Sequence, residues 1–223
     1  TGGIYFGQPR GRSEDGNSAF DSCIYSKEEI LRVSKLAFEA AKNRNKRVTL
    51  VDKANVLATS RLWRETVQEL AADYPDISLD FMFVDNAAMK IIQNPGYFDV
   101  VLTENMFGDI ITDEASVISG SLGMLPSASI GKNQNLYEPI HGSYPQAAGK
   151  NIANPFGAIL SAAMLVEYSF GLVEESRLIQ KAVNQALDEG FVTEDINSET
   201  TKSTDEVGDR IVSIISELAT VDS

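Results

Sequence analysis

Apolar and polar positions alternate along this chain between the period of a strand and the period of a helix. Three short apolar runs predict strands, namely "RVTLVD" (47–52), "ISLDFMFVD" (77–85) and "FDVVLT" (98–103). The intervening segments repeat apolar residues every three or four positions, which predicts helices over 26–42, around 63–74, over 86–93 and over 106–119. Alternating strands and helices favour βαβ units. The sequence therefore predicts an α/β fold with functional groups at the carboxyl ends of its strands.

Capping signals and apolar faces support the predicted helices. Ser26 with Glu29 and Ser203 with Glu206 form capping boxes at the start of the first and last helix. The expected apolar faces are Ile30, Val33, Ala37 and Ala41 in the first helix, Trp63, Val67, Leu70 and Tyr74 in the second, and Val207, Ile211, Ile214 and Leu218 in the last.

The composition of the chain changes near Gly120. From there to Asn154 it is rich in Gly, Ser, Pro and Asn, which predicts a long loop that is functional or disordered. Asn154 and Pro155 then supply an N-cap and a first-turn proline for the apolar helix "FGAILSAAMLVEYSF". We therefore expect two domains, residues 1–120 and residues 121–223.

Composition limits the function classes. The 223 residues carry a net charge of −13, which argues against nucleic acid or an anionic membrane as a partner. The single Cys23 excludes an internal disulfide and is typical of a reducing compartment. We see neither a signal peptide nor an apolar run long enough to cross a bilayer, so we expect a cytoplasmic protein.

Two aspartates in "GDIITDEAS", Asp109 and Asp113, are candidate metal ligands. They lie one helical turn apart, and like charges at that spacing destabilise a helix slightly unless a cation lies between them. Carboxylate oxygens suit Mg²⁺ or Mn²⁺. The alternative is an ordinary solvated helix face, where such pairs are common. The apolar residues Ile110 and Ile111 between the two acids favour a functional site.

Three further side chains have both a chemical and an ordinary interpretation. Lys53, at a strand's carboxyl end, is a candidate base or a simple charge at the rim of the sheet. Tyr5, in "GGIYFG", is a candidate general acid or an exposed turn residue, and His141 is a candidate stacking ring or a plain loop histidine. Neither G-x-G-x-x-G after a strand nor a P-loop motif occurs, so the spacing alone indicates no nucleotide cofactor.

Seven motifs in order resemble one enzyme family. They are "GGIYFGQPRG", "VDKANVL", "VDNAAM", "ENMFGDIITDEAS", "GSLGMLPSASIG", "EPIHGSYPQAAGKNIANP" and "STDEVGD". Together they resemble the isocitrate/isopropylmalate dehydrogenases, which are metal-dependent and β-decarboxylating, and the first motif is closer to the isopropylmalate branch. The resemblance implies a two-domain fold, with a small dimerising domain over 1–120 and the carboxyl-terminal part of a large cofactor-binding domain over 121–223.

The resemblance also implies roles for individual residues. Tyr5 matches the tyrosine that protonates the enol after decarboxylation, and Lys53 matches the lysine that helps remove the substrate's hydroxyl proton. Asp85, Asp109 and Asp113 match three metal ligands for Mg²⁺ or Mn²⁺. In the family, the equivalents of Lys53 and Asp85 reach into the partner's site in a homodimer. We expect the helices that carry Trp63 and Asp109 to form that interface. The segment that matches the adenosine site for NAD contains His141, Gly142, Ser143, Tyr144, Gln146, Ala147 and Asn154.

The implied reaction is oxidative decarboxylation of 3-isopropylmalate to 4-methyl-2-oxopentanoate in leucine biosynthesis, with reduction of NAD. The alternatives are another β-decarboxylating dehydrogenase, acting on isocitrate, homoisocitrate or tartrate, and a catalytically silent dimerisation fragment. Two departures from the family pattern keep these open. The family's long amino-terminal segment, with most of its substrate-binding arginines, does not precede Thr1. Gln146 stands where NAD-dependent members often carry an aspartate, so NAD remains favoured over NADP but by a smaller margin than in those members.

Overall fold

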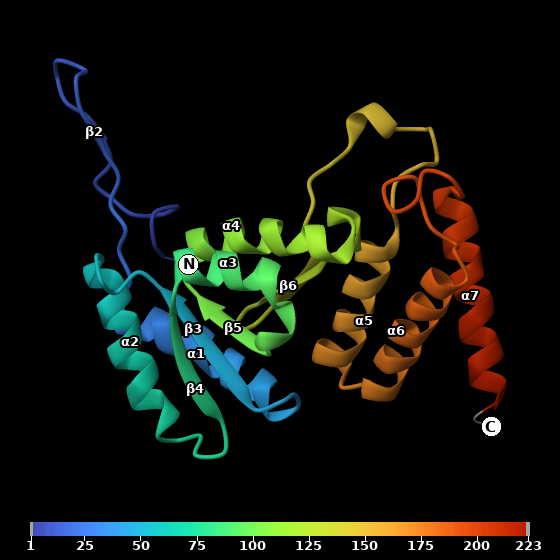
Figure 1. The fold of residues 1–223 in the computed structure, drawn as a ribbon, viewed down its shortest axis with the longest axis horizontal. Coiled ribbons are helices and arrows are strands. Elements are labelled where there is room, and N and C mark those ends of the chain that lie inside the picture. Colours follow the sequence, from blue (N-terminus) through green and yellow to red (C-terminus); the bar gives the residue numbers. More distant parts are fainter. Residues whose placement is uncertain (1, 222–223) are drawn as a thin grey trace. The chain divides into compact units, whose positions relative to one another are not determined.

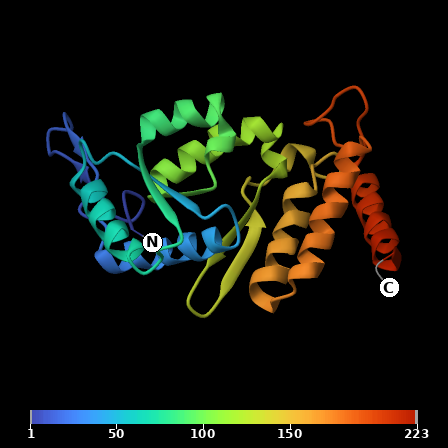
Figure 2. The ribbon, with the colours of Figure 1, turned by 60° about the horizontal axis from the view of Figure 1, so that its bottom comes forward.

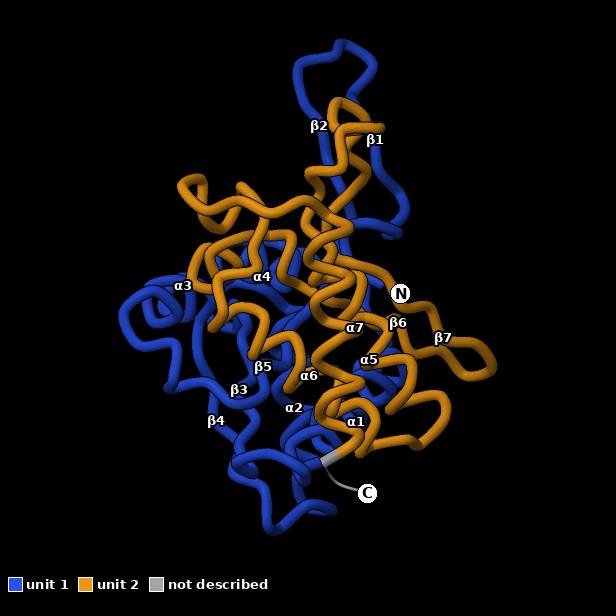
Figure 3. The backbone as a smooth tube through the Cα atoms, turned by 90° about the vertical axis from the view of Figure 1, so that its right-hand side faces the viewer, with its two compact units in different colours: residues 1–115 blue, residues 116–223 orange. Residues whose placement is uncertain are grey.

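The computed structural model describes residues 2–221, which fold into two compact units. The first unit covers residues 1–115 and the second covers residues 116–223 (Figure 3). Each unit has its own hydrophobic core. The helices of the described part are too short or too polar to cross a membrane.

The first unit is built on a parallel sheet of three strands. They are β3 (Arg47–Asp52), β4 (Ser78–Phe83) and β5 (Val100–Thr103), in the order β4-β3-β5. The three predicted strands are therefore confirmed, although the second ends two residues earlier than expected. A short antiparallel pair that we did not predict, β1 (Gly11–Arg12) and β2 (Ala19–Phe20), precedes the sheet (Figure 1). Because β3, β4 and β5 run in parallel, their carboxyl ends meet at one edge.

Helices cover both faces of this sheet. α1 (Lys27–Lys42) and α2 (Ala58–Ala71) pack on one face, and α3 (Val84–Gln93) and α4 (Asn105–Ser116) pack on the other. Successive residues of β3 serve the two faces, since Val48 and Leu50 join the core under α1 and α2 while Val51 joins the core under α3 and α4. The strand is therefore apolar along its whole length, as expected of a central parallel strand.

The predicted face of α1 is wrong in one detail, and the predicted face of α2 is confirmed but does not suit the interface expected of it. In α1, Val33 is 39% exposed, and the buried positions are Ile30, Ser34, Phe38 and Ala41, a stripe with slightly different spacing. In α2, the side chains of Trp63, Val67 and Leu70 are buried in the unit's own core. They pack against α1 and β3, so this face of α2 is not available for an interface between subunits.

The second unit consists of a strand hairpin and three helices. The hairpin of β6 (Pro126–Ile130) and β7 (Asn135–Pro139) lies against α5 (Phe156–Phe170), which packs on α6 (Val173–Asp188), and α6 packs on α7 (Thr204–Val221) (Figure 2). The prediction of a long loop over 120–154 is thus wrong in its centre, because packing on the apolar helix α5 stabilises strands of low β propensity. Short 3-10 turns complete the chain at η1 (Pro95–Tyr97), η2 (Val117–Ser119), η3 (Leu122–Met124) and η4 (Pro145–Ala147).

Both predicted capping boxes are present. Ser26 accepts a hydrogen bond from the Glu29 amide, and the Glu29 carboxylate accepts one in return from the Ser26 amide at 2.8 Å. Ser203 and Glu206 repeat this arrangement at the start of α7. The N-cap of α5 is Pro155, one position later than the predicted Asn154, and Asn154 accepts a hydrogen bond from the Phe156 amide at 2.9 Å.

Candidate active site

The carboxyl edge of the parallel sheet presents an ion pair. Lys53 follows the last residue of β3, and Asp85 lies in the first turn of α3, directly after β4. Lys53 Nζ donates to Asp85 Oδ1 over 2.7 Å. This hydrogen bond, with the charge of the ammonium group, lowers the pKa of Asp85 below its usual value. The Asp85 side chain is 65% exposed, so the pair faces solvent and is open to a ligand.

A second pair joins the start of the chain to α4. Tyr5 Oη donates to Asp109 Oδ2 over 2.8 Å, although 104 residues separate the two positions in the sequence. The hydrogen bond to Asp109 is the main cause that raises the pKa of Tyr5. The phenol therefore keeps its proton at neutral pH, which is the state that a general acid requires. Asp113 lies one turn further along α4, and both aspartates are exposed.

Glu104 fixes the start of the helix that carries these aspartates. Its buried carboxylate accepts hydrogen bonds from the amides of Phe107, at 3.0 Å, and Met106, at 3.3 Å. It also accepts one from Tyr25 Oη at 2.9 Å, and burial together with this carboxylate raises the pKa of Tyr25. A negative charge at a helix amino terminus is favourable. Glu104 therefore acts as a cap that orients α4.

The structure brings the five predicted catalytic and metal residues together as two pairs with Asp113 beside the second. Within residues 2–221, no group of three acidic, histidine or cysteine side chains is arranged to hold a metal ion. One chain thus does not gather Asp85, Asp109 and Asp113 into one ligand set. Carboxylate oxygens on Asp109 and Asp113 are nevertheless donors that Mg²⁺ and Mn²⁺ prefer.

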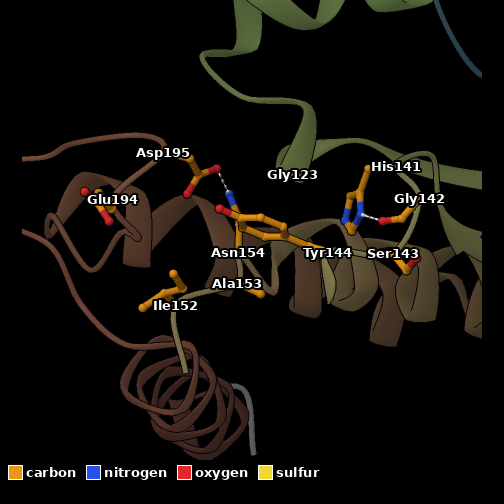
Figure 4. A pocket seen from close by; sticks show the side chains of 10 residues that line it. All are labelled: Gly123, His141, Gly142, Ser143, Tyr144, Ile152, Ala153, Asn154, Glu194 and Asp195. Carbon is orange, nitrogen blue, oxygen red and sulfur yellow. Dashed lines mark hydrogen bonds between the residues drawn. The ribbon is translucent and has the colours of Figure 1, made fainter. Parts of the chain in front are cut away.

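The second unit contains a cavity of about 590 Å³ beside the predicted cofactor segment (Figure 4). Five of the seven predicted cofactor residues line it, namely His141, Gly142, Ser143, Tyr144 and Asn154. Gln146 and Ala147 lie in η4 and are not among the lining residues. The volume falls within the usual range for small-molecule sites, and the rings of His141 and Tyr144 give the cavity aromatic surface.

Sequence reasoning missed two carboxylates of this cavity, Glu194 and Asp195. Asp195 accepts hydrogen bonds from Asn154 at 2.9 Å, from Thr193 at 2.5 Å and from Ser121. Burial raises the pKa of Asp195, but these hydrogen bonds outweigh that effect and lower it. The Asp195 carboxylate thus ties Asn154 to the loop after α6 (Figure 4). The ten residues that line the cavity include two acidic side chains and neither lysine nor arginine.

Comparison with known proteins decides the family. A family model described as isocitrate/isopropylmalate dehydrogenase matches residues 1–211. This chain belongs to the isocitrate/isopropylmalate dehydrogenase family. The resemblance of the seven sequence motifs to this family is thereby confirmed.

Curated members of the family give the more specific likeness. The chain is 53% identical to the 3-isopropylmalate dehydrogenase of Thermotoga maritima over 97% of its own length and 61% of that protein. It is 58% identical to the 3-isopropylmalate dehydrogenase of Geobacillus kaustophilus over 88% of its own length and 54% of that protein. The chain therefore spans little more than half the length of these dehydrogenases.

Solved structures confirm the family fold. The isocitrate dehydrogenase of Methylococcus capsulatus superposes with a TM-score of 0.89 at 36% identity, covering 96% of this chain and 65% of that one. A β-decarboxylating dehydrogenase of Thermococcus kodakarensis, in its apo form, gives a TM-score of 0.87 at 37% identity, covering 97% and 63%. The predicted α/β fold of the isocitrate/isopropylmalate dehydrogenases is thus confirmed.

Proposed function

We propose that this chain is the catalytic and dimer-forming part of an NAD-dependent 3-isopropylmalate dehydrogenase. The proposal depends chiefly on one structural relationship, the phenol of Tyr5 held against Asp109 on the helix that also carries Asp113. Two curated relatives, 53% and 58% identical to this chain, are named 3-isopropylmalate dehydrogenase, which supports 3-isopropylmalate as the substrate. The single cysteine fits our proposal of a cytoplasmic location.

In the proposed reaction, the alcohol at C2 of 3-isopropylmalate is oxidised to a ketone. The hydride on C2 passes to NAD, and the hydroxyl loses its proton. Lys53 of the partner chain helps to remove the hydroxyl proton, and its side chain lies at the open edge of the sheet beside Asp85. Loss of CO₂ from the carboxylate on C3 then leaves an enolate. Tyr5, whose phenol carries its proton at neutral pH, gives that proton to C3 and so forms 4-methyl-2-oxopentanoate.

A divalent cation fits the carboxylates of the site. Asp109 and Asp113 would hold Mg²⁺ or Mn²⁺, with Asp85 of a second chain as the third ligand. When bound, the cation would polarise the substrate's hydroxyl and carboxylate oxygens. The separation of the chain's site residues into two pairs supports a site shared between subunits, since the described part holds no complete ligand set.

A homodimer would supply the second half of each site. Met89 and Ile92 of α3 are 55% and 64% exposed, and Ile110 of α4 is 58% exposed. Exposed apolar side chains on helices beside the catalytic residues are suited to an isologous interface. The interface that we propose therefore uses α3 and α4, and it excludes the buried face of α2.

NAD fits the cavity of the second unit better than NADP. The rings of His141 and Tyr144, with the small residues Gly142 and Ala153, leave room for an adenosine. Glu194 and Asp195 could accept hydrogen bonds from ribose hydroxyls but would repel a 2′-phosphate, and no cation among the lining residues would offset that repulsion.

A steady-state assay tests the proposed function. The chain, alone and fused to the amino-terminal segment of the Thermotoga maritima relative, is supplied with NAD, Mn²⁺ and either 3-isopropylmalate, isocitrate or tartrate. We expect the fused protein to reduce NAD with 3-isopropylmalate at a much higher kcat/KM than with the other two acids. Preference for isocitrate or tartrate would assign the chain to another branch of the family. A folded, dimeric but inactive fusion would favour a silent dimerisation module.

A further inference from the structure

A buried ion pair lies directly behind the proposed catalytic lysine. Asp52 is the last residue of β3, and its side chain is only 3% exposed. Arg64 of α2 binds it with two hydrogen bonds, from Nε to Oδ2 at 2.6 Å and from Nη2 to Oδ1 at 3.1 Å. A bidentate arginine fixes the orientation of a carboxylate as well as its position. The Asp52 carboxylate is therefore immobilised at the end of the strand.

The immobilised Asp52 orders the backbone that carries Lys53. Asp52 Oδ1 also accepts a hydrogen bond from the Ala54 amide at 3.0 Å. The Lys53 amide donates to the hydroxyl of Ser60, a buried residue of α2, at 3.1 Å. Both peptide groups that flank the Lys53 side chain are thus tied to side chains held by α2.

Arg64 also contacts the strand that leads to Asp85. Asp52 and Phe83 are the last paired positions of β3 and β4. The guanidinium of Arg64 lies 5.1 Å from the centres of the Phe83 and Phe81 rings, a distance typical of cation–π contact. One side chain therefore spans the two strand ends from which Lys53 and Asp85 emerge, only one and two residues further along.

We propose that Arg64 is a positioning residue for the reaction. By clamping Asp52 beside Phe83, it sets the distance between the two strand ends and so holds Lys53 and Asp85 in the geometry that the reaction requires. The role in catalysis rests on the function proposed above, whereas the ordering of the Lys53 backbone does not. A displacement of about 1 Å at a catalytic group can lower a rate about a hundredfold, so a clamp of this kind has a measurable effect.

The chain offers a matched control for this proposal. Arg44 binds Asp99, whose side chain is only 2% exposed, through a contact of 3.1 Å at the opposite end of the same sheet. Arg64→Gln and Arg44→Gln therefore each leave a buried aspartate without its arginine. Both changes should lower the melting temperature, but only Arg64→Gln should alter the proposed site.

Amide hydrogen exchange and kinetics provide the test. In Arg64→Gln, we expect exchange at the Lys53 and Ala54 amides to accelerate at least about tenfold more than exchange at the core amide of Leu50, which reports only the loss of global stability. In the fused enzyme, kcat for 3-isopropylmalate should fall roughly 10- to 100-fold with little change in KM. Arg44→Gln should alter neither measurement. Arg64→Lys keeps the positive charge but cannot make both hydrogen bonds to Asp52, so its effects on exchange and kcat should be intermediate. It replaces Arg64→Gln if the glutamine variant does not fold.

The outcomes separate this proposal from the proposed function. Unchanged exchange at Lys53 and Ala54, or an unchanged kcat in an active fused enzyme, would overturn the positioning role. Equal effects of Arg64→Gln and Arg44→Gln on exchange and kcat would reduce Arg64 to a structural residue. If the fused protein did not oxidise 3-isopropylmalate, the proposed function would fail, and hydrogen exchange would still decide whether Arg64 orders the Lys53 backbone.

Discussion

Tyr5 donates a hydrogen bond to Asp109 over 2.8 Å and thereby links the first turn of the chain to the helix of the proposed metal ligands. The phenol is consequently placed beside the carboxylate that would face the substrate. The same contact raises the pKa of Tyr5, so the phenol stays protonated at neutral pH, as its proposed role requires.

Tyr5→Phe should separate the two chemical steps. We expect kcat in the fused enzyme to fall roughly 10²- to 10⁴-fold, because the enolate is left without the acid that protonates it. Hydride transfer precedes that step, so rapid-mixing absorbance should still show a first turnover of NADH formation. Tyr137→Phe is the control. It removes a hydroxyl that contacts Ser169 within the second unit, and it should leave both the first turnover and the steady-state rate unchanged. Loss of the first turnover in Tyr5→Phe would contradict the assigned role.

The three aspartates should contribute to cation binding without supporting the fold. Asp85→Asn, Asp109→Asn and Asp113→Asn should each weaken Mn²⁺ binding in calorimetric titration of the dimer, because each removes a charged oxygen ligand. Asp109→Asn and Asp113→Asn should stabilise the metal-free protein by a few tenths of a kcal/mol through relief of repulsion between the two carboxylates. Glu114→Gln, on the same helix, is the matched control. Unchanged affinity in all three variants would exclude the proposed site.

The cavity carboxylates should set the choice of dinucleotide. We expect NAD to bind more tightly than NADP, and Glu194→Gln to narrow that preference roughly tenfold, because like charges across a contact are unfavourable. Gln146→Ala should change the preference little, since Gln146 does not line the cavity. Fluorescence titration with both dinucleotides measures the ratio. A large effect of Gln146→Ala with none from Glu194→Gln would reverse the assignment.

Glu189 should make stability depend on acid pH. Hydrogen bonds from Arg210 and then Gln185 lower the pKa of Glu189 from 4.5 to about 2. A carboxylate whose folded-state pKa is depressed stabilises the protein above its unfolded pKa, and this contribution is lost as the pH falls through the folded pKa. Glu189→Gln should therefore lower the melting temperature at neutral pH, and the difference from wild type should disappear between about pH 4.5 and 2. A difference that persisted below that range would contradict the ion pair's role.

The parts of the fold with strong periodicity were predictable. The apolar strands of the first unit, the two capping boxes and the stripe of α7 follow directly from local sequence. The hairpin β6–β7 was not predictable, because "PSASI" and "NLYEP" each contain a proline and only one β-branched or aromatic residue. Its stability comes from packing on α5, a contact that no local pattern contains.

The candidate site, like the fold, was only partly predictable from local sequence. Lys53 and Asp85 were expected at neighbouring strand ends, and a parallel sheet brings such ends together. The contact between Tyr5 and Asp109 joins distant segments, so only the family resemblance pointed to a common site. Glu194 and Asp195 were missed because they fall outside the motifs that we compared. The only local signal was Thr193 two residues before Asp195, a pattern that favours side-chain hydrogen bonds in turns.

The central claim is that each active site combines Tyr5, Asp109 and Asp113 of one subunit with Lys53 and Asp85 of its partner, and mixing two inactive variants tests it directly. Lys53→Ala and Asp109→Asn dimers should each be inactive. At equal mixing with random exchange, about half the dimers are hetero and each has one intact site, so activity should recover to about a quarter of the wild-type level. Mass spectrometry of the mixture confirms that subunits have exchanged. Full exchange without any recovery would mean that all five residues act within one chain, and would contradict the shared site.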